Sequence, residues 1–141
     1  MFFEGQEDVG LLRKFSADRG IEPLEVFGYG VAGSGNVKHF LRMTNELGIV
    51  SCAIFDKDKE NDFDEARRLF PDCLVELLPM PDIRDKIRRD KVKGEDILEK
   101  EGLFDNTGNI KVQHEQYLLD LIERIRTYFV DKAATGKACA P

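Results

Sequence analysis

Acidic residues stand at the ends of two hydrophobic segments that are far apart in the sequence. Glu4 follows two phenylalanines, Asp56 ends the apolar segment 50–56, and Asp58 comes two residues later. Both segments have the pattern of buried parallel strands, and ligands of parallel sheets bind beyond the carboxyl ends of the strands. Asp8 lies one helical turn after Glu4 and can face the same edge. Carboxylates gathered there would bind a hard cation such as Mg2+ or Mn2+, and such sites most often serve phosphate chemistry.

A simpler interpretation of the aspartates is that both belong to a turn and that Asp58 caps the next helix. For an isolated Asp-x-Asp this interpretation would be preferred. Here the pair is accompanied by Glu4-Gly5 at the end of another strand. The combination favours a metal site made of Glu4, Asp8, Asp56 and Asp58, with Glu4, Asp56 and Asp58 as its catalytic members.

A glycine-rich turn over residues 28–35 allows three interpretations, of which the simplest is a flexible crossover between a strand and a helix. Residues 28–33 match the Gly-x-Gly-x-x-Gly fingerprint of dinucleotide-binding domains, and Asp56 follows at a suitable distance. Against a dinucleotide site, the turn follows the second strand, and the helix is expected to start only at residue 36. The preferred interpretation is a close approach of a phosphate backbone. The candidate phosphate or nucleic-acid contacts, here and elsewhere, are Gly33, Gly35, Asn36, Lys38, Lys57, Arg88 and Arg89.

The elements that must position these residues alternate between strands and helices. Hydrophobic periodicity and Gly or Pro stops predict strands at 1–4, 24–29, 50–56 and 73–78, and helices at 6–19, 36–47, 62–69 and 113–130. This order predicts an α/β, Rossmann-like three-layer domain with a four-stranded parallel sheet. We expect one domain over 1–131, with a core at 1–80 and a helical extension at 82–131. Two short helices are expected in 83–101, a loop at 102–110, and a disordered tail at 132–141.

Composition restricts the class of protein. The chain has 141 residues and a net charge of -6, and its apolar runs are too short to cross a membrane. The acidic balance is a weak objection to nucleic-acid binding, because a metal site would account for part of it. The basic run 86–93 is either a solvated helix face or a phosphate-backbone contact. Three widely spaced cysteines predict reduced thiols and a cytoplasmic protein.

The same residues resemble a known domain. Phe-Phe-Glu-Gly-Gln-Glu-Asp at 2–8, the glycine-rich turn with Asn36, and Leu-Gly-Ile before Phe-Asp-Lys-Asp at 55–58 resemble a Toprim domain. The order is most similar to the Toprim part of OLD-family nucleases or of small stand-alone OLD-like proteins. The resemblance covers about the first 80 residues, and Leu-Pro-Met-Pro-Asp-Ile at 78–83 adds to it.

The resemblance implies Mg2+- or Mn2+-dependent cleavage of DNA or RNA. In the family, the positions that match Glu4, Asp56 and Asp58 bind the metal, and Asp8 matches a further acidic position. Family members often have an acidic residue where this chain has Arg84, and Asp85 is a possible substitute. A later lysine contributes to the family's site, and Lys111 is a candidate for it. OLD proteins carry an ATPase part ahead of the Toprim part, so we expect a fragment of a longer protein or a minimal stand-alone version.

Three hypotheses therefore follow from the sequence. The leading one is a metal-dependent Toprim-type nuclease domain. The second is a non-catalytic Toprim-fold module that binds metal or nucleic acid, and the third is a dinucleotide-binding domain.

Overall fold

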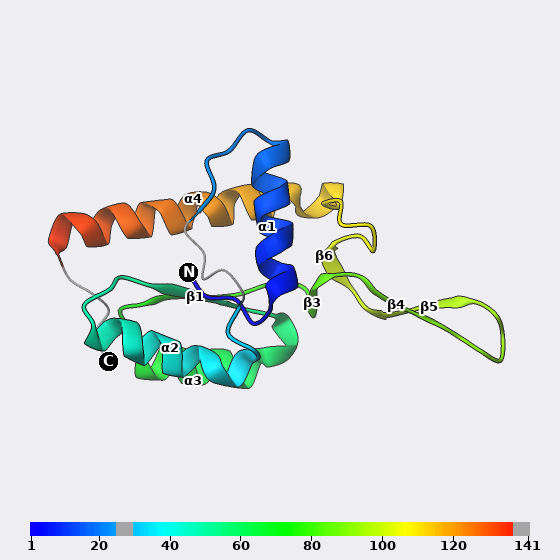
Figure 1. The fold of residues 1–141 in the computed structure, drawn as a ribbon, viewed down its shortest axis with the longest axis horizontal. Helices are drawn as coiled ribbons and strands as arrows, with labels where there is room; N and C mark the ends of the chain where they lie inside the picture. Colours follow the sequence, from blue (N-terminus) through cyan, green and yellow to red (C-terminus); the bar gives the residue numbers. More distant parts are fainter. Residues whose placement is uncertain (25–29, 137–141) are drawn as a thin grey trace.

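The protein is a mixed α/β molecule, as the computed structural model shows for residues 1–24 and 30–136 (Figure 1). In chain order the elements are α1 (Gln6–Asp18), α2 (Ser34–Glu46), β1 (Cys52–Phe55), the 3-10 turn η1 (Lys57–Lys59), α3 (Glu60–Leu69), β2 (Leu74–Leu77), β3 (Asp82–Arg84), β4 (Lys86–Arg89), β5 (Asp96–Lys100), β6 (Gly102–Phe104) and α4 (Val112–Thr135).

The centre of the fold is the parallel pair β1–β2, in register from Cys52 opposite Leu74 to Phe55 opposite Leu77. The chain start lies on the other side of β1, where Phe2 forms a single parallel bridge with Ala53. Described strands thus form three two-stranded pairs, and the predicted four-stranded sheet is not seen. The predicted strand 1–4 is reduced to that bridge, and most of the predicted strand 24–29 lies outside the described residues.

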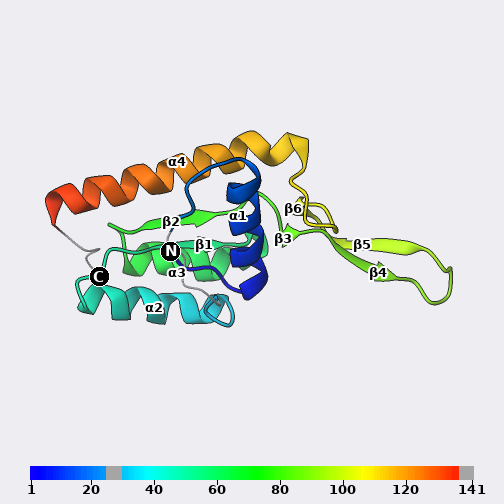
Figure 2. The ribbon, with the colours of Figure 1, turned by 45° about the horizontal axis from the view of Figure 1, so that its top comes forward.

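Helices cover both faces of the central pair. In both views α2 and α3 lie on one side of β1 and β2, and α4 lies on the other (Figures 1 and 2). Alternate residues of β1 face the two layers: Cys52 and Ile54 pack with α1 and α4, whereas Ala53 and Phe55 pack with α2 and α3. Burial on both faces explains why this strand is a continuous apolar run, as the sequence predicted.

Residues 82–104 differ most from the sequence-based prediction. They form no helices: β3 pairs in parallel with β6, and β4 and β5 form an antiparallel hairpin that extends away from the body (Figures 1 and 2). The turn between β4 and β5 is closed by Asp90, whose Oδ1 accepts the backbone N–H of Val92 at 2.8 Å, and by Gly94 at φ 68°. This turn chemistry brings two charged segments together, and cross-strand pairs such as Ile87–Leu98 then stabilise them.

Other boundaries are close to those predicted, with one correction at the end of the chain. Helix α1 is confirmed, and α2 and α3 each begin two residues earlier than expected. Helix α4 continues to Thr135, so residues 132–135 belong to it and not to a disordered tail. Two alanines favour this continuation, and Gly136, in the left-handed conformation, ends the helix.

The prediction of three reduced thiols also needs correction. Cys73 is disulfide-bonded, whereas Cys52 is a free, buried thiol. The cysteine argument for a cytoplasmic protein therefore no longer holds. In residues 1–24 and 30–136, none of the helices has both the length and the apolar character needed to span a bilayer.

Candidate metal centre

Two of the predicted acidic residues are positioned by neighbouring segments of backbone. The Phe2 N–H donates to the Cys52 carbonyl at 2.9 Å, and the Ile54 N–H donates to the Phe2 carbonyl at 3.0 Å. The two segments are parallel, so Glu4 and Asp56 follow them at the same edge. This placement agrees with the expectation that the strand ends meet.

A third acidic residue reaches this edge by a route that the sequence analysis missed. After β2 the chain stays beside the chain after β1: the Leu78 N–H donates to the Phe55 carbonyl at 2.8 Å, and the Lys57 N–H donates to the Met80 carbonyl at 3.1 Å. Asp82 follows directly at the start of β3. The available signal was its position just after an apolar strand and two prolines.

The fourth carboxyl group comes from the first turn of α1. Asp8 is buried, and its Oδ2 accepts the backbone N–H of Gly5 at 3.0 Å. The residue thus caps its own helix from the N3 position, and this fixes the carboxyl group beside Glu4.

Electrostatic interactions link the four acidic residues. The pKa of Asp56 is raised to about 9, first by burial, then by hydrogen bonding with the carboxyl group of Glu4 and by the charges of Asp8, Glu4 and Asp82. The pKa of Asp8 is likewise raised to about 7, mainly by burial and also by the charges of Glu4, Asp82 and Glu7, while the hydrogen bond from Gly5 lowers it. We call Glu4, Asp8, Asp56 and Asp82 the acidic cluster.

The acidic cluster contains an unsatisfied atom that fits a cation. Oε1 of Glu4 is buried and has no hydrogen-bond partner among the described residues. A buried carboxylate oxygen without a donor is costly, and a bound cation would remove that cost. Within residues 1–24 and 30–136, no three acidic, histidine or cysteine side chains lie together in a way that could hold a metal ion.

Asp58, the remaining predicted ligand, is engaged elsewhere. It lies in η1, and its Oδ2 accepts Nζ of Lys100, at the end of β5, at 2.7 Å. The pKa of Lys100 is raised, first by the hydrogen bond with Asp58 and further by the charges of Asp58, Asp82 and Asp56. Lys100 is therefore a positive charge at the border of the acidic cluster. No sequence motif marked it, because its position depends on the hairpin.

Two predicted substitutes for family residues bind each other instead. Nζ of Lys111 lies 2.7 Å from Oδ1 of Asp85, and both side chains are mostly buried. The same Asp85 oxygen accepts the backbone N–H of Gly102 at 2.8 Å. This pair joins the start of α4 to the β3–β6 pair, so the structure gives Asp85 and Lys111 a structural position.

The glycine-rich turn packs against the start of α1. A Cβ atom at Gly30 would lie 2.5–2.9 Å from backbone atoms of Gly5, so only glycine fits there. The space in front of Gly30 is thus filled by the protein itself, which argues against a pyrophosphate at that position. One argument against the dinucleotide fingerprint was nevertheless wrong, because α2 begins at Ser34, immediately after Gly33. Residues 28 and 29 lie outside the described part.

Two of the predicted phosphate contacts near this turn have side chains with intramolecular partners. Nδ2 of Asn36 donates to the carbonyls of Val31 and Ala32, both at 3.0 Å, and closes the turn. Lys38 pairs with Glu65 at 3.1 Å and joins α2 to α3. Gly33 and Gly35 lie exposed at the start of α2, and the side chain of Lys57 is exposed in η1.

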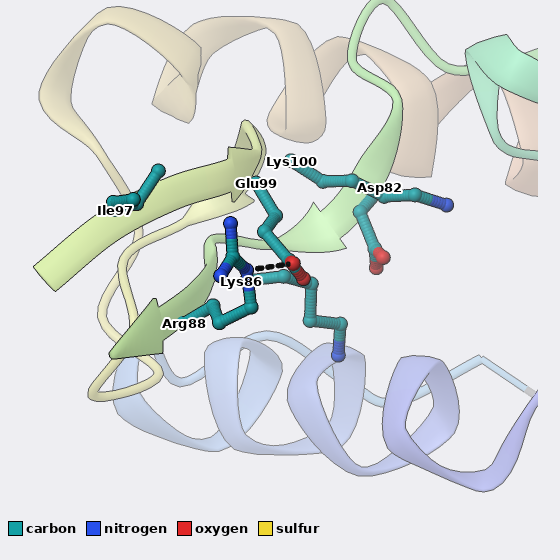
Figure 3. A pocket seen from close by; sticks show the side chains of 6 residues that line it. All are labelled: Asp82, Lys86, Arg88, Ile97, Glu99 and Lys100. Carbon is teal, nitrogen blue, oxygen red and sulfur yellow. Dashed lines mark hydrogen bonds and ion pairs between the residues drawn. The ribbon is translucent and has the colours of Figure 1, made fainter. Parts of the chain in front are cut away.

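Arg88 and Arg89 lie on the hairpin, on opposite faces of β4. Nε of Arg88 lies 2.7 Å from Glu99, and Arg89 lies 3.4 Å from Asp96. An open groove of about 660 Å3 lies along the Arg88 face, and its lining consists of Asp82, Lys86, Arg88, Ile97, Glu99 and Lys100. Figure 3 shows Asp82 at one end of the groove and Ile97 at the other. The groove and the acidic cluster thus share Asp82.

Comparisons with protein-family models, with curated proteins and with solved structures found no match. The resemblance to Toprim domains therefore stays a prediction that rests on the motifs.

Proposed function

We propose that this chain is a Toprim-type domain that cleaves phosphodiester bonds of nucleic acid with Mg2+ or Mn2+ held by the acidic cluster. One observation carries the proposal: four carboxyl groups from three separate segments interact electrostatically near the carboxyl end of β1, and Glu4 there has a buried oxygen without a partner among the described residues. Toprim-type folding would place residues 2–4, β1 and β2 in one parallel sheet. The parallel bridge from Phe2 to Ala53 supports this arrangement, and backbone hydrogen bonds from Val31 and Gly33 to Phe3 and Glu4 hold residues 2–4 in position.

The proposed role of each residue follows from its position. Glu4 and Asp56 would hold the cation, with Asp8 and Asp82 beside them, since carboxylate oxygens are the preferred ligands of hard divalent ions. When bound, the cation supplies polarisation of the scissile phosphate and a water of lowered pKa. Lys100 lies at the border of the cluster and can stabilise negative charge on the phosphate.

In the protein without metal, the carboxyl group of Asp56 carries a proton that a bound cation would displace. Because the pKa of Asp56 is raised to about 9, its carboxyl group is mostly protonated at neutral pH. Metal ligands must be deprotonated, so cation binding is expected to release protons and to tighten as the pH rises towards 9.

The test compares plasmid nicking by the wild type and by two variants, Glu4→Gln and Asp56→Asn. We expect Mg2+- or Mn2+-dependent nicking by the wild type, and a loss of at least about 100-fold in each variant, as for removal of a group that acts in the transition state. A matched control is the pair Asp64→Asn and Glu123→Gln, exposed carboxylates on α3 and α4 that form no ion pair in the described structure.

The two site variants separate the enzyme from contaminating nucleases, and the control pair, which should nick as the wild type does, shows that a loss is specific to the acidic cluster. Nicking that survives in Glu4→Gln and Asp56→Asn would refute the proposal. Metal binding without cleavage in the wild type would favour the non-catalytic module, and NAD(H) binding that is insensitive to Mg2+ would favour the dinucleotide-binding domain.

A further inference from the structure

The hairpin of β4 and β5, residues 86–100, is a two-stranded ribbon that extends away from the rest of the molecule (Figures 1 and 2). Every residue of β5 is exposed, and so are the last three residues of β4. Isolated two-stranded ribbons gain little stability of their own, and unpaired sheet edges promote aggregation. Because the ribbon adds little stability and exposes strand edges, we expect it to have a binding function.

Positive charge is concentrated on β4, and the tip of the ribbon carries Lys91 and Lys93 together with Asp90 and Glu95. Residues 86–93 contain five basic side chains and one acidic one, in a chain whose net charge is -6. Lys91 and Lys93 at the tip form no ion pair among the described residues. These two lysines are thus placed where they meet an approaching molecule first.

The ion pairs farther along the ribbon can be exchanged. Arg88 and Arg89 pair with Glu99 and Asp96 through side chains that are about half or more exposed. Exposed pairs of this kind contribute little to stability, so a phosphate can replace the carboxylate at small cost. Arg88 also lines the groove that ends at Asp82, so its partner would lie on the path to the acidic cluster (Figure 3).

The width of the ribbon and its lack of aromatic side chains indicate which kind of nucleic acid it would bind. A two-stranded ribbon fits the major groove of B-form DNA, whereas the major groove of double-stranded RNA is too narrow for side chains to enter. Residues 86–100 contain no aromatic side chain on which unpaired bases could stack. The ribbon is thus suited to the phosphate backbones of a DNA duplex.

We propose that the β4–β5 ribbon inserts into the major groove of double-stranded DNA, and that the groove lined by Lys86, Arg88 and Lys100 leads one phosphate backbone to the acidic cluster. This inference rests on the proposed function and names its substrate. Binding would depend mainly on phosphate contacts and only weakly on sequence.

The test measures binding of the full chain to a short fluorescent DNA duplex by anisotropy, without divalent metal, so that no cleavage is required. In Lys91→Gln/Lys93→Gln we expect affinity to fall on the order of 10-fold, and the slope of log K against log salt to fall by about 2. The matched control is Arg42→Gln/Arg68→Gln, with the same change of charge on exposed residues of α2 and α3. The control should bind as the wild type does.

Competition with single-stranded DNA and with an RNA duplex of the same sequence completes the test, and the DNA duplex should bind most tightly. Equal affinities of the tip variant, the control and the wild type would overturn the inference, as would the absence of binding or a preference for either competitor. Metal-dependent nicking that is unaffected by the tip substitutions would leave the proposed function intact and refute the ribbon's role. DNA binding that depends on the ribbon, without any nicking, would support the ribbon's role and refute the proposed function.

Discussion

Asp85 and the acidic cluster are two acidic sites of this protein that differ in how their negative charge is compensated. Asp85 has a lysine of the same chain at 2.7 Å and a backbone N–H at 2.8 Å. The acidic cluster, of which Asp82 shortly precedes Asp85 in the sequence, has instead raised pKa values at Asp56 and Asp8 and a single helix cap.

The difference separates a structural site from a binding site. A carboxylate that is paired with a lysine of the same chain, as Asp85 is, joins two elements and does not require a bound metal ion. A group of carboxylates without such a partner keeps raised pKa values, and raised pKa values in a cluster at a strand end are typical of functional sites. The comparison predicts opposite effects of neutralising substitutions at the two places.

The largest effect is expected at the compensated site. Lys111→Met leaves the mostly buried carboxylate of Asp85 without its cation, and we expect the free energy of unfolding to fall by about 3 kcal/mol. Chemical denaturation measures the change. Lys93→Met, on the exposed tip, should change stability by less than about 0.5 kcal/mol. A similar small change in Lys111→Met would show that the two acidic sites do not differ in this way.

A smaller effect of opposite sign is expected in the acidic cluster. Because the folded-state pKa of Asp56 and of Asp8 is raised, the folded protein binds more protons than the unfolded chain above pH about 4. The stability of the metal-free protein should therefore fall as the pH rises from about 4 towards 9. Asp56→Asn should weaken this dependence and stabilise the protein by about 1–2 kcal/mol near pH 8.

Thermal unfolding at several pH values, with EDTA and with Mg2+, measures this second effect. Mg2+ should stabilise the wild type and leave Asp56→Asn nearly unchanged, because a ligand stabilises only the state that binds it. Destabilisation of the metal-free protein by Asp56→Asn at high pH would mean that the cluster is compensated after all.

The smallest effect is expected at Lys100, which lies at the border of the acidic cluster. Lys100 and Asp58 form an ion pair whose side chains are 44% and 31% exposed, so Lys100→Met should change the free energy of unfolding by less than about 1 kcal/mol. The substitution frees Asp58 near the acidic cluster, and calorimetric titration with Mn2+ should show a modest rise in affinity. A fall in Mn2+ affinity would show that Lys100 supports the cation site and does not compete with it.

The sequence by itself determined the central part of the site. The apolar run ending at Asp56 and the phenylalanines before Glu4 dictate buried parallel segments, and parallel segments end at the same edge. Helix α1 and the amphipathic helix α4 also follow from periodicity, because their apolar faces are local properties of the chain.

Only the tertiary structure decided which charges meet. Charged residues at 83–101 alternate in a way that suits a solvated helix or a hairpin, and the Asp90–Gly94 turn selects the hairpin. That selection brings Lys100 to Asp58, and the chain following β2 brings Asp82 to the cluster. Ion pairs between residues far apart in sequence leave no periodic pattern, because their partners are set by packing and not by spacing along the chain.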